Sequence, residues 1–376
     1  MRRALRNILF IANSPEIGGG NKSLETLASG LLNEGLNPII IVSEQGPATQ
    51  MFKEHGFNVL TLKYAQPSFS TPLLTIKQLI HWIYLLHKYH IDIVHANGTL
   101  AARSITQATW IYGIPLICHV RSSLGEAFYS YCFKYLPQPA AFIFVSNAMK
   151  NSIEPLLRKQ CSKASYYAVH NAVILDCNQA LIVRDSVERI GIIANLQAVK
   201  GHEDFIQMAS LLIKDYPDIQ FDVVGTDIHN EGREIVLKKL AKQLNLESRI
   251  VFHGFIQDVL MFIDNLDIVV CPSHDEPFGR CAIEAMSRGK SVIVTNVGGL
   301  PEIVKNGENG FIVHPHHPME LAEACRVLLS NRNLRYEIAK NNVDRVNNVF
   351  SQKAHVQRIK EIYLESIKTY NRKFVK

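Results

Sequence analysis

The feature of this sequence that most limits its fold is an alternation of short apolar runs with stretches of helical period. In the first half, an apolar run at 7–12 is followed by a stretch at 21–33 that carries its leucines on one face, and the two patterns recur up to residue 96. Continuous apolar strands that alternate with amphipathic helices are typical of a parallel sheet covered on both faces. The first half therefore predicts a Rossmann-like α/β domain.

The second half repeats this layout. Its apolar runs lie at 189–194, 220–224, 250–252, 268–271, 291–295 and 311–313. The segment 174–188 has mixed polarity without a clear period, so we expect the linker there. A chain of 376 residues accommodates two domains, and we predict them at 1–173 and 187–350. The last stretch, 351–376, has the apolar stripe of an amphipathic helix.

Composition and charge narrow the class of protein. With 47% hydrophobic and 20% charged residues, the chain has the composition of an ordinary globular protein. Its net charge of +6 is too small and too dispersed to indicate nucleic-acid binding. The 7 cysteines include no Cys-x-x-Cys pair, which predicts reduced thiols in a cytosolic protein.

The N-terminus has a basic start followed by an apolar run. This run is too short for a signal peptide, and we interpret it as the first strand. No apolar run approaches the roughly 18 residues that a membrane-spanning helix needs. Arg2, Arg3 and Arg6, together with other basic residues of the first domain, suggest reversible attachment to the anionic inner face of a membrane. An ordinary solvated basic surface is the alternative.

A short segment, 271–284, contains the residues that point most directly to a function. Glu276 lies in a loop at the carboxyl end of an apolar strand, and Glu284 lies on the helix that follows. In an open α/β sheet, ligands bind at that edge. Gly279 lets a ligand approach the backbone, and the free N–H groups of the first helical turn favour an anion. Two carboxylates beside an anion site suit a sugar nucleotide, whereas two solvated surface acids are the alternative.

This segment resembles the Glu-x7-Glu motif of the retaining glycosyltransferases of family 4 (glycosyl transferases group 1). It has Glu-Pro-Phe-Gly at the first acid and Glu-Ala-Met at the second, and the segments 297–302 and 309–311 also resemble that family. The resemblance implies the GT-B fold, in which two Rossmann-like domains face each other across a cleft and the last helix, 351–376, packs back on the first domain. It implies retaining transfer of a hexose-type sugar from a nucleoside diphosphate sugar, expected to be UDP-linked, to a glycan or lipid-linked acceptor in cell-surface polysaccharide synthesis.

On the donor side, the resemblance gives each matching residue a role. Glu284 is expected to bind the ribose. Glu276 is expected to hold the sugar hydroxyls as a catalytic residue, together with the backbone at Phe278 and Gly279. Lys200, at the start of a helix, matches the lysine that binds the diphosphate.

One donor position departs from the family. Asn195 stands where an arginine usually supplies a second cation to the diphosphate, and Arg280 is a candidate for the missing charge. Two alternatives to a transferase stay open. One is a sugar-nucleotide epimerase of the same fold, which would release a free altered sugar. The other is a non-catalytic partner that binds the sugar nucleotide, and the departure at Asn195 keeps this alternative open.

The sequence contains no pattern for a cofactor or a metal. No Asp-x-Asp occurs, and Lys200 with two helix N-termini can neutralise a diphosphate, so we expect transfer to need no metal. His314, His316 and His317 lie among prolines without a cysteine or carboxylate pattern nearby, and we interpret them as a surface loop.

The first domain provides a second group of candidates. Gly19 and Gly20 fall in a glycine-rich loop that contacts donor phosphates or the acceptor in the family, with a simple turn as the alternative. His95 and His119 follow apolar runs at predicted strand ends. The resemblance places His119 close to the donor sugar, and we expect it to be a catalytic residue. His95 is a candidate for the acceptor side, and packed or hydrogen-bonded histidines are the alternative. Arg121 is a candidate for holding a phosphate or an anionic acceptor.

Overall fold

The computed structural model describes residues 5–12, 14–175, 181 and 183–374, with only the backbone described for 371–374. The chain divides into two compact units, Met1–Ala172 with Gln352–Lys376 and Val173–Ser351. Arg2 and Arg3, and residues 176–180 and 182 of the predicted linker, lie outside the described residues. None of the described helices is long and apolar enough to cross a membrane.

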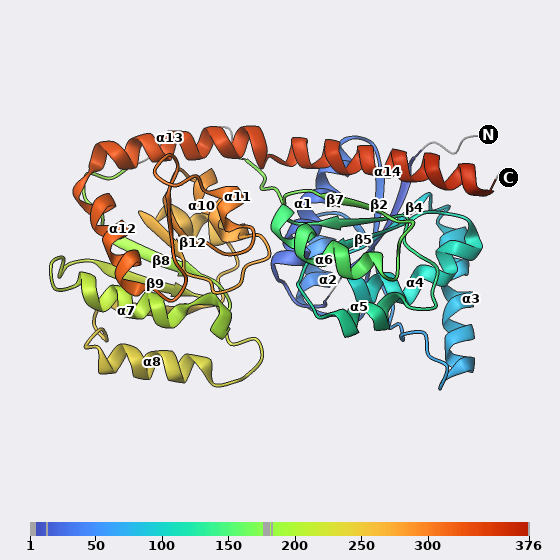
Figure 1. Ribbon diagram of the computed structural model, residues 1–376, viewed down its shortest axis with the longest axis horizontal. Coiled ribbons are helices and arrows are strands. Elements are labelled where there is room, and N and C mark those ends of the chain that lie inside the picture. Colours follow the sequence, from blue (N-terminus) through green and yellow to red (C-terminus); the bar gives the residue numbers. More distant parts are fainter. Residues whose placement is uncertain (1–4, 13, 176–180, 182, 375–376) are drawn as a thin grey trace. The chain divides into compact units, whose positions relative to one another are not determined.

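The first unit is built on a seven-stranded parallel sheet with the order β3-β2-β1-β4-β5-β6-β7. Figure 1 labels several of these strands and the helices around them. Its strands are β1 (Asn7–Ile11), β2 (Asn37–Val42), β3 (Asn58–Thr61), β4 (Ile93–Ala96), β5 (Leu116–Val120), β6 (Ala141–Phe144) and β7 (Ser165–Ala168). The order reverses between β1 and β4, which pair in parallel. The predicted Rossmann-like fold of this half is confirmed, and its switch point is where such sheets bind ligands.

The helices of the first unit include the one that ends the chain. They are α1 (Gly19–Asn33), α2 (Pro47–Glu54), α3 (Pro72–Lys88), α4 (Thr99–Tyr112), α5 (Glu126–Phe133), α6 (Asn147–Arg158) and α14 (Gln352–Phe374). The apolar stripe of α14, including Val356 and Ile359, is buried in one core with the leucines of α1. A Cβ atom at Gly30 of α1 would lie 2.5 Å from Cγ2 of Val356, so this glycine permits the close packing. Each fully buried aliphatic side chain contributes about 1.5–3 kcal/mol to such a contact.

The second unit has a six-stranded parallel sheet with the order β10-β9-β8-β11-β12-β13. Its strands are β8 (Arg189–Ile193), β9 (Gln220–Val224), β10 (Ile250–Gly254), β11 (Ile268–Cys271), β12 (Ser291–Thr295) and β13 (Phe311–Val313). The helices are η1 (Ala198–Lys200), α7 (His202–Leu212), α8 (Arg233–Gln243), α9 (Val259–Asp264), α10 (Arg280–Ser287), α11 (Leu300–Ile303), α12 (Pro318–Ser330) and α13 (Arg332–Val349). This sheet confirms the second predicted Rossmann-like fold, and its order reverses between β8 and β11.

Candidate functional site

Two loops meet at the switch point of the second sheet. The loop after β8 ends in the 3₁₀ helix η1, and Gly201 joins it to α7 with a φ of +70°. A Cβ atom at Gly201 would lie 1.9 Å from the carbonyl oxygen of Pro272, so glycine alone allows this approach to the loop after β11. The backbone N–H of His274 donates to the carbonyl oxygen of Val199 over 2.7 Å. The two loops that carry the predicted donor residues are therefore joined.

Lys200 and Glu276 form the central ion pair of this site. Nζ of Lys200 lies 2.7 Å from Oε2 of Glu276, and the hydroxyl of Ser273 donates to the same oxygen over 3.4 Å. Both charged side chains are mostly buried, with 19% and 15% exposed. Burial disfavours the charged lysine, but the adjacent carboxylate of Glu276 outweighs it, and the pKa of Lys200 is raised. The sequence assigns these side chains to different parts of a donor, whereas the structure joins them directly.

The backbone of Glu276 is held by the segment after β12. A Cβ atom at Gly298, which has a φ of +51°, would lie 1.9 Å from the carbonyl oxygen of Glu276. The N–H of Gly299 donates to that same oxygen over 3.0 Å. The hydroxyl of Thr295 donates to the carbonyl oxygen of Ser273 over 2.5 Å. The loop that presents Glu276 is thus fixed by backbone contacts that need two glycines.

The second acid lies on α10, which begins after Gly279. Gly279 adopts a φ of +106°, and a Cβ atom there would lie 2.4 Å from Cδ2 of Leu300. Nε of Arg280 lies 2.7 Å from Oε1 of Glu284 one turn along the helix. Arg280 is thus paired with Glu284, the acid expected to bind the ribose. This pairing argues against Arg280 as the second cation for the diphosphate. Phe278 is buried, with 2% exposed.

Asn195 lies in the loop between β8 and η1. Its carbonyl oxygen accepts from the N–H of Gln197 over 2.7 Å, and the carbonyl of Gln197 accepts from the N–H of Lys200 over 2.9 Å. A Cβ atom at Gly225 would lie 1.9 Å from the carbonyl oxygen of Ala194, so the end of β9 packs closely against this loop. The half-buried Asn195 side chain makes no hydrogen bond to another described residue. The turn brings Asn195 and Lys200 into one hydrogen-bonded loop.

Three residues near this site escaped the sequence reasoning. Cys271 and Cys281 flank the Glu276 loop with their sulfur atoms 3.3 Å apart, and both are free thiols. The contact with Cys281, reinforced by burial, raises the pKa of Cys271. His202, the first residue of α7, is fully buried, and burial lowers its pKa to about 4. Their spacing matches no motif. The only local signals were the glycines before two of them, Gly201 before His202 and Gly279 before Cys281.

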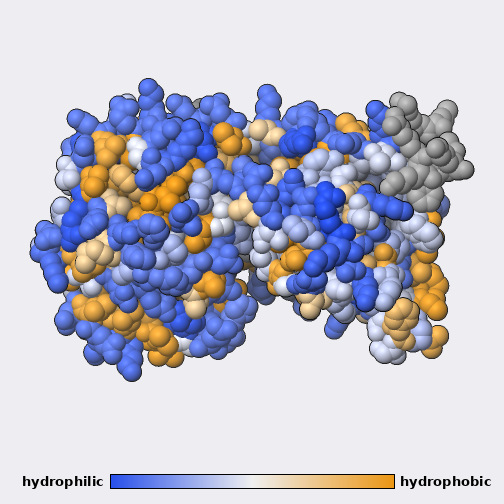
Figure 2. Space-filling model, in the orientation of Figure 1, coloured by the Kyte–Doolittle hydropathy of each residue, from blue (hydrophilic) through white to orange (hydrophobic). Residues whose placement is uncertain are grey.

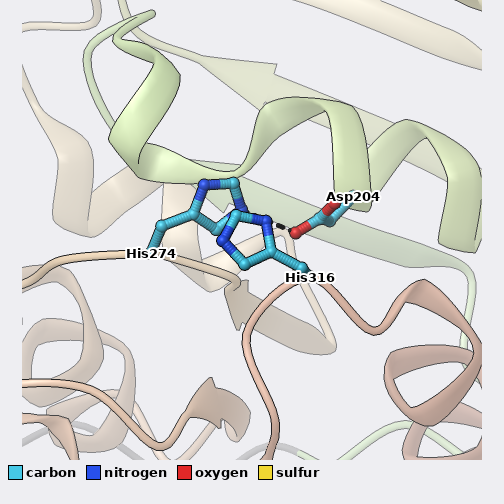
Figure 3. A group of neighbouring side chains, drawn as sticks. All are labelled: Asp204, His274 and His316. Atoms are coloured by element: carbon cyan, nitrogen blue, oxygen red, sulfur yellow. Dashed lines mark hydrogen bonds and ion pairs between the residues drawn. The ribbon is translucent and has the colours of Figure 1, made fainter.

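The loop after β13 carries His314, His316 and His317. His314 and His317 are exposed, and Nδ1 of His314 lies 3.1 Å from Oε2 of Glu320. All three histidines lie in an exposed loop, as predicted, but the sequence did not indicate the carboxylate beside His316. Its side chain lies beside that of Asp204, which belongs to α7 (Figure 3).

In the first unit, the two predicted histidines are in direct contact with each other. Nε2 of His95 lies 3.1 Å from Nδ1 of His119, and Nδ1 of His95 lies 2.6 Å from the hydroxyl oxygen of Tyr363 on α14. Both histidines are fully buried, and burial, followed by the charge of Arg121, holds their pKa values well below the usual range. Both rings are therefore neutral at neutral pH. Nε2 of His119 has no hydrogen-bond partner among the described residues.

The remaining candidates of the first unit form a hydrogen-bonded group. Nε of Arg121 donates to Oδ1 of Asn97 over 2.7 Å, and Nη1 donates to Oδ1 of Asn171 over 2.5 Å. Nδ2 of Asn97 donates to the carbonyl oxygen of Gly20 over 3.1 Å. Gly19 and Gly20 are not loop residues, because α1 begins at Gly19. They contribute backbone N–H groups of a helix N-terminus instead of a flexible loop.

Comparison with known proteins identifies the class. The model of the Glycosyltransferase Family 4 family matches residues 17–176, and that of the Glycosyl transferases group 1 family matches residues 179–345. Between them, the two models match most of the chain, so the chain belongs to these families and is a glycosyltransferase of the GT-B type.

Individual relatives agree with this assignment. The chain is 25% identical over 344 residues to the capsular polysaccharide biosynthesis glycosyltransferase CapM of Staphylococcus aureus, which covers 86% of this chain and 88% of the relative. The fold of this chain matches that of a glycosyltransferase from Rickettsia africae ESF-5 with a TM-score of 0.82 and 22% identity, over 96% of this chain and 99% of that chain. It also matches Anabaena Alr3699/HepE, solved in complex with UDP-glucose, with a TM-score of 0.81, 22% identity and the same coverage of 96% and 99%.

Proposed function

We propose that this glycosyltransferase moves a hexose-type sugar from a UDP-linked donor to a glycan or lipid-linked acceptor, with retention of the anomeric configuration. The observation that carries the proposal is the joined pair of loops in which Lys200 and Glu276 lie 2.7 Å apart. A cation at the start of a helix and a carboxylate beside it suit the two halves of a sugar nucleotide, which are an anionic diphosphate and a sugar rich in hydroxyl groups.

The donor's diphosphate would be bound by the positive charge of Lys200 and by the helix that follows it. The helices α7 and α10 each follow a glycine N-cap, so phosphate oxygens can approach the backbone of their first turns closely. Glu284 would accept hydrogen bonds from the ribose hydroxyls. Glu276 would hold the sugar hydroxyls, and its ion pair with Lys200 would link the position of the sugar to that of the diphosphate.

In the first unit, we propose His119 as a contact of the donor sugar and the group around Arg121 as the acceptor side, with His95 behind it. The His119 ring is neutral, and the contact between its Nδ1 and Nε2 of His95 leaves Nε2 of His119 on the opposite side of the ring. A neutral imidazole can donate a hydrogen bond to a hydroxyl without bringing a charge to the reacting centre. Arg121 would offer a positive charge to a phosphate or an anionic acceptor.

Catalysis would rest on positioning and on stabilising the departing diphosphate. A retaining transfer of this kind brings the incoming hydroxyl close to the leaving phosphate oxygen, and preorganised donors at that oxygen lower the barrier. Lys200 and the two helix N-termini supply those donors, so we propose that no divalent cation is needed for transfer. A UDP-linked donor is supported by the fold match to HepE, whose structure contains UDP-glucose.

The proposed acceptor is a growing cell-surface polysaccharide or its lipid-linked precursor. The name of the relative CapM places that protein in capsular polysaccharide biosynthesis. Lipid-linked precursors of such polysaccharides reside in a membrane. Helix α3 offers a surface for contact with an anionic bilayer, because it exposes Leu73, Leu74, Ile76, Ile80 and Tyr84. Figure 2 shows hydrophobic residues on the surface where α3 lies. The segment between Glu54 and Asp92 contains lysines but no acidic residue, so its charge suits anionic lipid.

The test is a transfer assay with UDP-, GDP- and ADP-linked sugars in parallel, each with and without a chelator. We expect acceptor product from a UDP-sugar, with or without chelator, and an unchanged anomeric configuration by NMR. Loss of activity in chelator that Mg²⁺ or Mn²⁺ restores would refute metal-free transfer. Free sugar without acceptor product would favour the epimerase, and binding without turnover across a broad acceptor panel would favour a non-catalytic partner.

A further inference from the structure

Three side chains from separate elements of the second unit converge beside the Lys200 turn (Figure 3). Asp204 comes from the first turn of α7, His274 from the loop after β11, and His316 from the loop after β13. One oxygen or nitrogen atom from each lies within 4.8 Å of those of the other two. Nε2 of His274 lies 2.7 Å from Oδ2 of Asp204, and the two imidazole rings lie with their centroids 3.6 Å apart.

We propose that Asp204, His274 and His316 form a binding site for a divalent transition metal, with Zn²⁺ as the first candidate. Two imidazole nitrogens and one carboxylate are ligands that Zn²⁺ and its neighbours prefer, whereas Mg²⁺ and Ca²⁺ prefer oxygen. Three protein ligands leave one position of a tetrahedral ion for water. Ligand atoms on such an ion lie about 3.4 Å from one another, given metal–ligand distances of about 2.0–2.2 Å. To reach that spacing, the 2.7 Å between Asp204 and His274 would widen by about 0.7 Å, and a separation of up to 4.8 Å within the cluster would close by about 1.4 Å.

The burial of the three residues suits such an ion. Asp204 is buried, with 8% exposed, and its carboxylate is held in place by the contact with His274. His274 is half-buried, and His316 is exposed, so its ring can turn to direct a nitrogen toward the other two ligands. The site is therefore closed on the side of α7 and open to an ion from solvent on the side of His316.

The backbone of the His316 loop provides a second observation. His316 has a φ of +63°, in the left-handed region that residues other than glycine rarely adopt. Such strain persists where surrounding structure holds it and is concentrated at functional sites. Nδ1 of His317 lies 2.8 Å from the carbonyl oxygen of Pro315, and His314 binds Glu320, so both neighbours are held elsewhere. The side chain of His316 makes no hydrogen bond to another described residue and is turned to Asp204 and His274.

The bound ion would act as a clip between loops and would take no part in the transfer step. His274 precedes Glu276 by two residues, and Asp204 follows Lys200 by four. An ion held by both residues would fix the Glu276 loop to the start of α7, and His316 would tie the loop after β13 to them. The inference rests on ligand type and geometry, so it stands or falls independently of the proposed donor and acceptor.

The experiment uses the full chain, freed of metal by chelation and dialysis, with Zn²⁺ and Co²⁺ as probes. Isothermal calorimetry with Zn²⁺ should give one site per chain, and Co²⁺ should give visible absorption that Zn²⁺ abolishes. The His316→Ala variant should bind Zn²⁺ at least about ten-fold more weakly, since loss even of a residue behind a ligand costs 10–100-fold. Its side chain is exposed, so the variant should fold.

The matched control is His317→Ala, which removes an exposed histidine from the same turn but outside the cluster. This control is needed because the chain has 15 histidines that can bind metal weakly. Zn²⁺ should raise the melting temperature of the wild type and of His317→Ala, but not of His316→Ala. The absence of one stoichiometric site, or equal affinity and equal thermal shift in both variants, would overturn the proposal and leave only adventitious binding.

Discussion

The ammonium nitrogen of Lys200 and a carboxylate oxygen of Glu276 lie 2.7 Å apart across two loops of the second unit. The pair is mostly buried, so removing one partner would leave a charge poorly solvated. A donor diphosphate that binds Lys200 therefore changes the surroundings of Glu276 at the same time. This coupling makes separate substitutions at the two glutamates of the site informative.

Glu276→Gln and Glu284→Ala should have different effects. Glu276→Gln keeps the shape of the side chain and removes its charge, so we expect turnover to fall about 10–100-fold with a small change in donor affinity. Glu284→Ala should weaken donor binding by a similar factor. Both factors correspond to the roughly 1.5–3 kcal/mol of a hydrogen bond to a charged group. Calorimetry with the donor and steady-state rates measure the two effects separately.

The control for these variants is Glu323→Ala, which removes an exposed carboxylate from α12 in the same unit. It should leave donor affinity and turnover at wild-type values. Wild-type binding and turnover in both Glu276→Gln and Glu284→Ala would show that the donor site lies elsewhere.

Asn195→Arg should bind the donor more tightly, or at least as tightly as the wild type. The substitution adds a guanidinium to the loop that carries Lys200, where it can reach the diphosphate. The expected gain is about 1 kcal/mol, because desolvation offsets much of a charged hydrogen bond. Donor titration by calorimetry checks it. A marked loss of affinity would mean that the Asn195 side chain itself contacts the donor.

The buried histidines should make the protein less stable in mild acid. His95, His119 and His202 have folded pKa values depressed by burial, that of His202 to about 4. The unfolded chain binds their protons near pH 6.5 and the folded chain does not, so stability falls as the pH drops below that value. For His202, with its pKa of about 4, the free energy of unfolding should fall by about 2 kcal/mol between pH 7 and pH 5.

Urea unfolding at pH 7, 6 and 5 measures this loss. A His202→Gln variant should lose less stability over that interval than the wild type, because glutamine takes up no proton. If the variant and the wild type lose the same free energy of unfolding, His202 is not the buried neutral group that its environment indicates.

The protein should sediment with vesicles that contain anionic lipid, and salt should release it. Basic residues near an anionic surface contribute about 1 kcal/mol each, and this attraction is screened at high ionic strength. Ile80→Asp should weaken binding, because Ile80 is an exposed apolar residue of α3, with 63% exposed. Ile235→Asp is the matched control, since Ile235 is also exposed but lies on α8 of the second unit. Equal binding by both variants, or none at low salt, would exclude α3 as the contact.

Much of the architecture follows from local patterns in the sequence. Apolar runs of strand length and helical stripes depend on residues a few positions apart, so they predict the two parallel sheets before any tertiary contact is known. The roles of the glycines beside Lys200 and Glu276 can also be predicted from the local sequence. Gly201 and Gly279 mark turns in which a side chain would collide with the backbone of another loop or with a packed leucine. Glycine is needed there for steric reasons that act at single positions.

The tertiary structure alone decided which distant residues meet. Tyr363 on α14 binds His95, 268 residues away, because α14 packs on α1 and so reaches the buried strand ends. Asp204, His274 and His316 come together because three loop or helix starts gather at one sheet edge. Contacts of this kind depend on how strands order themselves in a sheet, which is a long-range property without a fixed spacing in the sequence. The residue types along the chain therefore determined the fold and the candidate donor residues, and the packing of the sheets determined which of their side chains are partners.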